Sequence, residues 1–297
     1  MHRSGFVALI GRPNVGKSTL LNALVGEKVA IISDRPQTTR NQIRAVLTRP
    51  EFQIIFIDTP GLHKPKHMLG TAMVQTARRT MQEVDLVCFL VEANENPGQG
   101  DRYIAEILGS VNSPLFLILN KIDLISPEKL AVNIELYRQI CPFKEHFALS
   151  ALKQINLEPL IEGVLEHLPE GPQYYPSDMI TDQPERFVAA EIIREKIIQL
   201  TRQEIPFSVA VVIEEMMPRR GGDLLDIRAE IFVERKSQVG IVVGKGGTLL
   251  KEVGTRAREE LEALFGQHIF LDLRVKVKRE WRNREEELRR LGYNQGG

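Results

Sequence analysis

The chain has 297 residues, 43% of them hydrophobic and 26% charged, and its 39 basic side chains balance 39 acidic ones. The length favours two domains, and the ordinary composition excludes disorder over most of the chain. Because the net charge is zero, a nucleic acid or an anionic membrane would need a local basic surface. Two cysteines are too few for a disulfide framework, and no apolar run approaches the ~20 residues of a membrane span. We therefore expect a cytosolic protein.

The first 168 residues alternate apolar runs with amphipathic stretches. Strands are predicted at 6–10, 43–47, 53–57, 86–91, 115–119 and 146–149. Helices are predicted near 17–25, 71–83, 100–109, 128–140 and 157–167. Several of these strands are apolar on both faces, as strands covered by helices are. The alternation predicts a doubly wound α/β domain over residues 1–168.

Four prolines within residues 169–184 predict a semi-stiff linker. The pattern after it favours a second, α+β domain over 185–279 with the order α-β-β-α-α-β. Its elements are predicted at 187–202, 208–213, 225–233, a short helix ending at 243, 248–265 and 269–277. In the last strand Leu271, Leu273, Val275 and Val277 alternate with polar residues. Residues 280–297 form a charged tail.

A phosphate-binding loop follows the first predicted strand and precedes a helix. The run Gly11-Arg12-Pro13-Asn14-Val15-Gly16-Lys17-Ser18 fits the pattern G-x-x-x-x-G-K-[ST] in the context that the pattern requires, and Thr19 continues it. Glycine lets the backbone curl so that its N–H groups point at phosphate oxygens. Lys17 supplies a charge to the β- and γ-phosphates, and the Ser18 hydroxyl is a ligand for Mg²⁺.

A second motif, Asp58-Thr59-Pro60-Gly61, directly follows the strand at 53–57. A carboxylate at this strand end suits a Mg²⁺ ion, and the Gly61 N–H is placed to sense a γ-phosphate. An N-capping Asp would account for the motif alone, but not for its spacing from the phosphate loop.

Two further motifs end later strands and point to the base. In Asn120-Lys121-Ile122-Asp123 the Asp123 carboxylate can accept two hydrogen bonds from guanine, whereas adenine would leave that charge unpaired. Asn120 is expected to brace the phosphate loop, and the Lys121 stem to cover the base. After the next strand, the N–H of Ala151, which follows Ser150, can contact the guanine carbonyl oxygen. In this order the motifs resemble those of the translation-factor-related GTPases.

That resemblance implies a switch and a particular catalytic chemistry. Thr39 in the loop at 33–42 would ligate Mg²⁺ only while the γ-phosphate is present, with Thr38 as the runner-up. Leu62 stands where many GTPases carry a water-orienting Gln, and Leu makes no such hydrogen bond. In similar GTPases an Asn at position 14 coordinates K⁺, which predicts slow hydrolysis that is faster in K⁺ than in Na⁺. The alternative, equally weighted, is that Asn14 only caps the loop.

The run Gly244-Lys245-Gly246-Gly247 lies between two predicted helices of the second domain. With the α-β-β-α-α-β order it resembles the GxxG loop of a type II KH domain, which binds about four nucleotides of single-stranded RNA or DNA. Arg274, Lys276 and Lys278 share one face of the last strand, and Arg219 and Arg220 lie on a predicted loop. These cations are candidates for phosphate contacts, although each is also an ordinary solvated side chain.

The combination resembles the Era family of bacterial ribosome-associated GTPases over about residues 5–293, on the segments GRPNVGKSTLLN, PQTTR, DTPGLHKP, NKID and VGKGGTLLKEVG. The one departure is Leu152, where many relatives carry Lys. The family implies GTP and GDP binding with Mg²⁺, binding near the 3′ end of 16S ribosomal RNA, and a role in maturation of the 30S subunit. It also suggests peripheral contact with the inner membrane, and no obligate protein partner is inferred.

Two other functions remain open from the residues alone. A P-loop ATPase or small-molecule kinase shares the phosphate loop, and Asp123 is the residue that separates it from a GTPase. A GTPase whose second domain binds protein is the other alternative, and Lys245 and Gly246 are the residues that test it.

Overall fold

The computed structural model describes residues 2–219 and 224–293 and divides into two compact units. The first unit consists of Met1–Ile32, Thr39–Lys66 and Gly70–Asp182, and the second of Ser33–Thr38, His67–Leu69 and Gln183–Gly297. Within the described residues, no helix combines the length and the apolar character needed to cross a bilayer.

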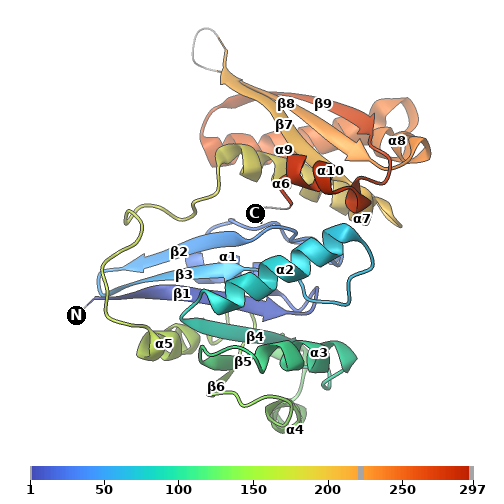
Figure 1. The fold of residues 1–297 in the computed structure, drawn as a ribbon. Coiled ribbons are helices and arrows are strands. Elements are labelled where there is room, and N and C mark those ends of the chain that lie inside the picture. The colour runs from blue at the N-terminus through green and yellow to red at the C-terminus, as the bar shows by residue number, and fades with distance from the viewer. Residues whose placement is uncertain (1, 220–223, 294–297) are drawn as a thin grey trace. The chain divides into compact units, whose positions relative to one another are not determined.

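The first unit contains a six-stranded sheet with the order β2-β3-β1-β4-β5-β6 (Figure 1). All neighbouring strands are parallel except the β2–β3 pair. The strands are β1 (Arg3–Gly11), β2 (Ile43–Arg49), β3 (Phe52–Asp58), β4 (Leu86–Glu92), β5 (Leu115–Asn120) and β6 (Glu145–Ala148). The helices are α1 (Lys17–Val25), α2 (Met68–Gln82), α3 (Gln99–Leu108), α4 (Pro127–Arg138) and α5 (Leu157–His167), with a short 3₁₀ turn η1 (Ile122–Leu124).

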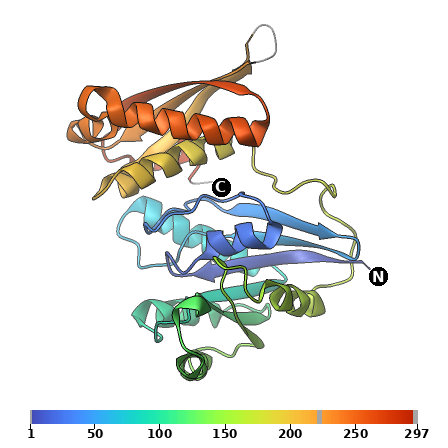
Figure 2. The ribbon, with the colours of Figure 1, turned by 180° about the vertical axis from the view of Figure 1, so that it is seen from behind.

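Helices cover both faces of this sheet, α2 and α3 on one and α1 and α5 on the other (Figures 1 and 2). Accordingly β3 and β5 are buried along their whole length, and Cys88 of β4 is fully buried. The doubly wound α/β arrangement predicted from the sequence is confirmed. Parallel strands place their carboxyl ends at one edge of the sheet, so the segments that follow β1, β3, β5 and β6 meet there.

Residues between Pro169 and Asp182, expected as a linker, pack along the edge of the first unit. The Ile180 carbonyl oxygen accepts a hydrogen bond from the Val46 N–H of β2 (2.7 Å), and Arg44 forms an ion pair with Asp182 (2.9 Å). The buried Gln53 amide binds the main chain of Tyr174 and Tyr175. An edge strand has unpaired N–H and C=O groups, and this segment satisfies some of them.

The second unit contains a three-stranded sheet with the order β7-β8-β9, in which β7–β8 is antiparallel and β8–β9 parallel. Its elements are α6 (Glu185–Leu200), α7 (Ile205–Ser208), β7 (Ala210–Pro218), β8 (Leu224–Val233), α8 (Lys236–Val243), η2 (Lys245–Gly247), α9 (Thr248–Phe265), β9 (His268–Val277), η3 (Trp281–Asn283) and α10 (Glu285–Arg290). Leu271, Leu273 and Val275 of β9 pack against the core formed with α6 and α9.

The predicted order of elements is confirmed, with one error at the start of β7. The strand expected from 208 begins at Ala210, because Pro206 lies in the first turn of the short helix α7 and Ser208 ends that helix. Arg220, expected on the loop between β7 and β8, lies outside the described residues.

Candidate nucleotide site and candidate RNA surface

The loop between β1 and α1 has the curled backbone that the phosphate-loop motif predicts. Asn14 and Gly16 have φ values of 69° and 99°, in the left-handed region. A Cβ atom at Gly16 would lie 2.3 Å from Nδ2 of Asn120, and one at Gly11 would lie 2.5 Å from the Leu90 carbonyl oxygen. Position 16 therefore requires glycine for both its backbone conformation and the space beside Asn120, and position 11 requires glycine for space alone.

Lys17 is buried beneath this loop. Its Nζ donates hydrogen bonds to the carbonyl oxygens of Arg12 (2.9 Å) and Gly11 (3.3 Å). Burial lowers the pKa of Lys17 to about 8, against the opposing effect of the nearby Asp58 carboxylate. A desolvated ammonium held at a phosphate loop is poised to gain from contact with phosphate oxygens.

Ser18, Thr39 and Asp58 meet at the end of β3. Ser18 Oγ donates to Asp58 Oδ2 (2.6 Å), lies 2.9 Å from Thr39 Oγ1, and Thr39 Oγ1 is 3.2 Å from the same carboxylate oxygen. Asp58 Oδ1 is buried and has no hydrogen-bond partner in the described structure. Burial raises the pKa of Asp58, opposed by Lys17 and the two hydroxyls. Two hydroxyls and a carboxylate with an unpartnered oxygen fit Mg²⁺, which prefers oxygen ligands.

The two threonines of the loop differ in their surroundings. Thr39 belongs to this cluster, whereas Thr38 Oγ1 donates to the Arg35 carbonyl oxygen (2.7 Å). The geometry therefore favours Thr39, the first choice made from the sequence.

The segment Thr59–Leu62 connects β3 to the phosphate loop. A Cβ atom at Gly61 would lie 2.7 Å from the Pro13 nitrogen, so glycine alone allows this approach. The Leu62 N–H donates to the Gly11 carbonyl oxygen (3.0 Å). The Leu62 side chain is buried in the core with α2 and α3 residues. It contributes to packing and offers no group that could orient water.

Asn120, at the end of β5, links three motifs. Its Nδ2 donates to the Val15 carbonyl oxygen (2.8 Å), the brace expected from the sequence, and its Oδ1 accepts from the Ala151 N–H (2.9 Å). Beside Ala151, Ser150 Oγ donates to Asp123 Oδ1 (2.5 Å). Asp123 itself is exposed, so its carboxylate is accessible to a base. One chain of hydrogen bonds thus joins the phosphate loop to the base-recognition residues.

Three ion pairs near this site had no signal in the sequence. Arg12 of the phosphate loop forms an ion pair with the fully buried Asp101 in the first turn of α3 (2.9 Å) and another with Glu95. Lys121, with φ 67°, forms an ion pair with Glu92 (2.8 Å). These partners lie at distant places in the sequence, where no spacing rule connects them.

The Gly244–Gly247 segment of the second unit joins α8 to α9. Gly244, Gly246 and Gly247 all have positive φ values. Nothing lies within 4 Å of a Cβ atom built at Gly246 or Gly247, and Lys245 is exposed. The backbone of this loop is therefore open to close approach by a ligand such as a phosphodiester.

A cavity of about 350 Å³ adjoins the loop. Its lining combines half-buried aliphatic side chains with cations and small residues: Gly247, Leu250, Lys251, Gly254, Thr255, Arg258, Leu271 and Leu273. Apolar surface beside cations suits unstacked bases joined by phosphates. Sequence reasoning missed Lys251 and Arg258, although their helical spacing of seven residues places them on one face.

The three cations predicted on one face of the last strand are all ion-paired, unlike the exposed Lys245. Arg274 forms an ion pair with Asp272 (3.0 Å), Lys276 with Glu230, and Lys278 with Glu287 (2.5 Å). Arg274 and Lys276 alternate with Leu273 and Val275, which face the core, so they point away from the cavity that Leu273 lines. The structure does not bring these two to the Gly244–Gly247 loop.

Comparison with known proteins identifies both units. Residues 6–121 match the family described as 50S ribosome-binding GTPase, and residues 204–282 match the KH domain. A solved structure of Era in complex with MgGDPNP and nucleotides 1506–1542 of 16S ribosomal RNA is 44% identical, with a TM-score of 0.96 over 99% of each chain. Aquifex aeolicus Era, as a Tyr-to-Ala variant bound to GDP and AlF4⁻, is 43% identical, with a TM-score of 0.93 over 98% of this chain and 99% of that one.

Proposed function

The chain belongs to the Era family of GTPases, and from that premise we propose that it binds and hydrolyses GTP, binds 16S ribosomal RNA near its 3′ end, and acts in maturation of the 30S subunit. The observation that carries the proposal is the hydrogen-bond chain from Val15 through Asn120 and Ala151 to the Ser150–Asp123 pair. This chain of hydrogen bonds fixes the position of the phosphate loop relative to Asp123, the proposed acceptor for guanine.

The phosphates of GTP lie in the loop Gly11, Arg12, Pro13, Asn14, Val15, Gly16, Lys17, Ser18 and Thr19. Lys17 contacts the β- and γ-phosphates, and the Gly61 N–H faces the γ-phosphate. Ser18, Thr39 and Asp58 would hold Mg²⁺, which supplies positive charge to the phosphate oxygens. Thr59, which is followed by Pro60, supports this position, since Thr59 Oγ1 donates to the Leu9 carbonyl oxygen (2.9 Å) and fixes the turn after β3.

Guanine specificity rests on Asp123 and separates this function from that of an ATPase or kinase. Asp123→Asn replaces one acceptor oxygen by a donor, so it should shift preference from GTP to xanthosine triphosphate. Binding of both nucleotides by the variant and by Glu128→Gln, which removes an exposed carboxylate from α4, tests this. Unchanged GTP preference in Asp123→Asn would favour an ATPase or kinase.

Hydrolysis is slow and stimulated by K⁺. The buried Leu62 orients no water, and Asn14 is exposed at a left-handed position where its side-chain oxygen can ligate a monovalent cation. Asn14→Gly keeps that backbone conformation and removes the amide. Single-turnover rates in KCl and NaCl should differ for the natural protein and be equal for Asn14→Gly. Retained K⁺ stimulation in the variant would mean that Asn14 only shapes the loop.

RNA binds the second unit at Gly244, Lys245, Gly246 and Gly247. Replacing Lys245 and Gly246 by Asp puts negative charge where the phosphodiester approaches, so binding of RNA spanning 16S nucleotides 1506–1542 should be lost. Lys153→Asp, at an exposed position of the first unit, is the matched control. Retained RNA binding would favour a second domain that binds protein.

Nucleotide state controls RNA affinity through the switch loop. Because Thr39 reaches the site only from the loop at 33–42, GTP with Mg²⁺ orders that loop and GDP releases it. RNA affinity should therefore be higher with a non-hydrolysable GTP analogue than with GDP, and identical affinities would remove the coupling.

The location is cytoplasmic, with peripheral contact at the inner membrane. Sedimentation with vesicles of phosphatidylethanolamine and phosphatidylglycerol tests the membrane part, and failure to cosediment would remove it. Sedimentation with isolated 30S subunits tests the ribosomal part, where the variant with Asp at 245 and 246 should stay unbound.

A further inference from the structure

The chain that leads from the first unit to the second is bonded to an edge strand of the first. β2 ends the six-stranded sheet, and its Val46 N–H donates to the Ile180 carbonyl oxygen (2.7 Å). Thr181 Oγ1 donates to the Arg44 carbonyl oxygen of the same strand (2.7 Å), and the Arg44 side chain binds Asp182 Oδ2 (2.9 Å). Three consecutive residues of the connection are thus bonded to one strand, which satisfies edge groups that would otherwise be open.

A second set of contacts holds the connection farther upstream. The Gln53 side chain of β3 is fully buried, and its Oε1 accepts from the N–H groups of Tyr174 (2.7 Å) and Tyr175 (2.9 Å). Its Nε2 donates to the Tyr175 carbonyl oxygen (2.9 Å), and the Tyr175 hydroxyl donates to Asp182 Oδ2 (3.1 Å). Releasing the connection would leave this buried amide without partners, which is costly. Residues 174–182, here called the strap, are therefore fixed at both ends.

Very little chain remains between the strap and the second unit. The strap and the first unit both end at Asp182, and α6 begins at Glu185, so that only Gln183 and Pro184 lie between them. Pro184 has a fixed φ (−58°) and restricts the residue before it as well. The three steps from 182 to 185 span at most about 10 Å, whereas the 16 steps from Pro169 would span about 55 Å if the strap were released.

The strap is fastened beside the nucleotide site. Arg44 follows Thr39, the proposed Mg²⁺ ligand, by five residues, and Ile43, the residue before Arg44, pairs with Asp58 in the β2–β3 ladder. The chain of the second unit therefore starts close to the end of the switch loop at 33–42. A short tether keeps the group that it carries at a high effective concentration near its anchor.

We propose that the strap is a fixed edge of the first unit, and that the two units turn about a hinge of only two residues, Gln183 and Pro184. The hinge limits how far the second unit can move from the switch loop. Its consequence for RNA affinity rests on the dependence on nucleotide state proposed above.

The decisive experiment places one insertion on either side of the β2 contacts in the full chain. About ten Gly and Ser residues between Asp182 and Gln183, the hinge insertion, add an end-to-end distance of about 17 Å to the tether. The same segment between Ser177 and Asp178, the strap insertion, enters an exposed turn whose two ends stay fastened. A linker that moves as a whole would respond equally to both, whereas a fastened strap passes on only the hinge insertion.

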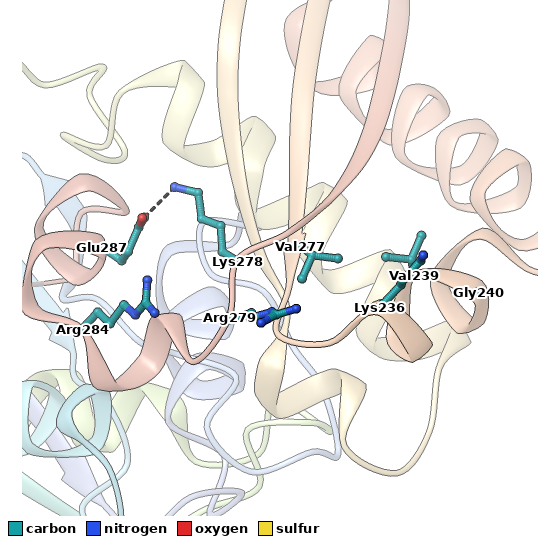
Figure 3. A pocket seen from close by; sticks show the side chains of 8 residues that line it. All are labelled: Lys236, Val239, Gly240, Val277, Lys278, Arg279, Arg284 and Glu287. Carbon is teal, nitrogen blue, oxygen red and sulfur yellow. Dashed lines mark hydrogen bonds and ion pairs between the residues drawn. The ribbon is translucent and has the colours of Figure 1, made fainter.

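The distance between one label on each unit measures the movement. Glu106→Cys on α3 and Glu259→Cys on α9 give exposed thiols for nitroxide labels, and both natural cysteines are buried. The α9 label reports the second unit as a whole, because α9 packs in its core and the Lys278–Glu287 pair drawn in Figure 3 ties the tail to the same unit. Pulsed EPR should show the distribution of the uninterrupted chain unchanged by the strap insertion, and wider by on the order of 10 Å in the hinge insertion.

Releasing the strap should act like lengthening the hinge. Thr181→Val combined with Asp182→Ala removes the side-chain bonds to β2, so the strap adds its own length to the tether. Glu158→Ala is the matched control, because Arg49 of β2 pairs with Glu158 of α5 and not with the strap. Hydrogen exchange of the Val46 N–H should become faster in the release variant alone. Faster exchange at Val46 without a wider distance distribution would overturn the proposal.

The outcomes separate this proposal from the function on which its consequence rests. Equal effects of the two insertions on the distance distribution would overturn the hinge. Affinities for RNA spanning 16S nucleotides 1506–1542, measured with GDP and with a GTP analogue, give the functional result. The hinge insertion should bring the ratio of these affinities close to one, and the strap insertion should leave it unchanged. If the natural protein already has a ratio of one, the proposed coupling fails, while the distances still decide the hinge.

Discussion

Each unit contains a glycine loop for which we propose contact with phosphates, but the two loops are built in opposite ways. In the first unit the loop is fixed by buried partners: Asn120 binds Val15, and Lys17 binds the Arg12 carbonyl oxygen. In the second unit Gly246 and Gly247 have empty space around them, and Lys245 is exposed. The first loop can therefore accept one compact ligand in one geometry, whereas the second can accept a chain whose position is adjustable.

The electrostatics follow the same division. Burial shifts the pKa values of Lys17 and Asp58 in the first unit, because charged groups there have lost water. Lys245, Lys251 and Arg258, beside the glycine loop of the second unit, are exposed and keep their water. Each phosphate contact there should therefore be weak and sensitive to salt, so that affinity depends on the number of contacts. A single substitution in the nucleotide site of the first unit should therefore weaken ligand binding strongly, whereas each substitution at the glycine loop of the second unit should weaken it only a little.

The largest effect is expected at Gly16. Gly16→Ala places a methyl group 2.3 Å from Asn120 Nδ2 and forces a left-handed backbone on alanine. Loss of the brace should weaken GTP binding by roughly 100-fold or more, about 3 kcal/mol. Gly26→Ala is the matched control, because Gly26 also has a positive φ (77°) but nothing within 4 Å. It should lower the free energy of unfolding by about 1 kcal/mol and leave GTP affinity unchanged. Equal GTP affinities in the two variants would mean that the contact between Asn120 and the phosphate loop is not needed for GTP binding.

The second largest effect is expected in the salt dependence of binding, which should be stronger for RNA at the second unit than for GTP at the first. Raising NaCl from about 0.05 to 0.2 M at constant K⁺ should weaken RNA binding roughly 50-fold if four phosphates are contacted, at ~0.7 per contact. The buried Lys17 is screened much less, so GTP binding should change by less than about fivefold. Parallel titrations of RNA and a GTP analogue on one preparation measure this. Equal salt dependence for the two ligands would contradict the contrast between buried and exposed contacts.

We expect pH to change the affinity for GTP about tenfold, through Lys17 at the nucleotide site. Lys17 has a pKa of about 8 before phosphate binds, and phosphate favours its charged form and so raises that pKa. GTP affinity should be level below pH 8 and about tenfold lower at pH 9 than at pH 7. Guanine also loses a proton at high pH. The control is therefore Lys17→Met, in which any remaining dependence of GTP affinity on pH comes from the guanine base. Equal slopes with and without Lys17 would show that its proton plays no part.

The sequence was sufficient to predict where the contiguous motifs lie in the fold. The phosphate loop, Asp58-Thr59-Pro60-Gly61 and Asn120-Lys121-Ile122-Asp123 are short motifs at strand ends, and parallel strands had to bring them to one edge. The β9 cations show the limit of such reasoning. Alternation placed Arg274 and Lys276 on one face of the strand, but no pattern could show that each has a carboxylate partner. Ion pairing between distant segments depends on the packed fold.

Gln53 shows the same limit for the linker. Four prolines predict a semi-stiff linker, but the attachment of this segment to the first unit depends on one buried amide in β3 that binds Tyr174 and Tyr175. A single Gln within an apolar strand gives no sign of this partner 122 residues away.

The smallest effect concerns the ion pair between Arg12 and Asp101. Asp101 is fully buried, its Oδ1 accepts from Arg12 Nε (2.9 Å) and its Oδ2 from the Gly98 N–H (2.9 Å), so it ties the phosphate loop to the start of α3. Asp101→Asn removes the charge at nearly constant shape. Because Arg12 keeps its contact with Glu95, the free energy of GTP binding should become less favourable by only about 1 kcal/mol. This corresponds to about a fivefold rise in the KM for GTP, with kcat little changed.

Glu95→Gln is the control for this last substitution, since it removes the exposed partner of Arg12 and should raise KM less. Thermal melting of both variants separates the two roles that Asp101 can have. A lowered melting temperature with an unchanged KM would mean that Asp101 only caps α3 through Gly98. A raised KM measured well below the melting temperature would mean that α3 sets the position of the phosphate loop through Arg12. In that case the rigidity of the nucleotide site extends beyond the glycine motif to the start of α3.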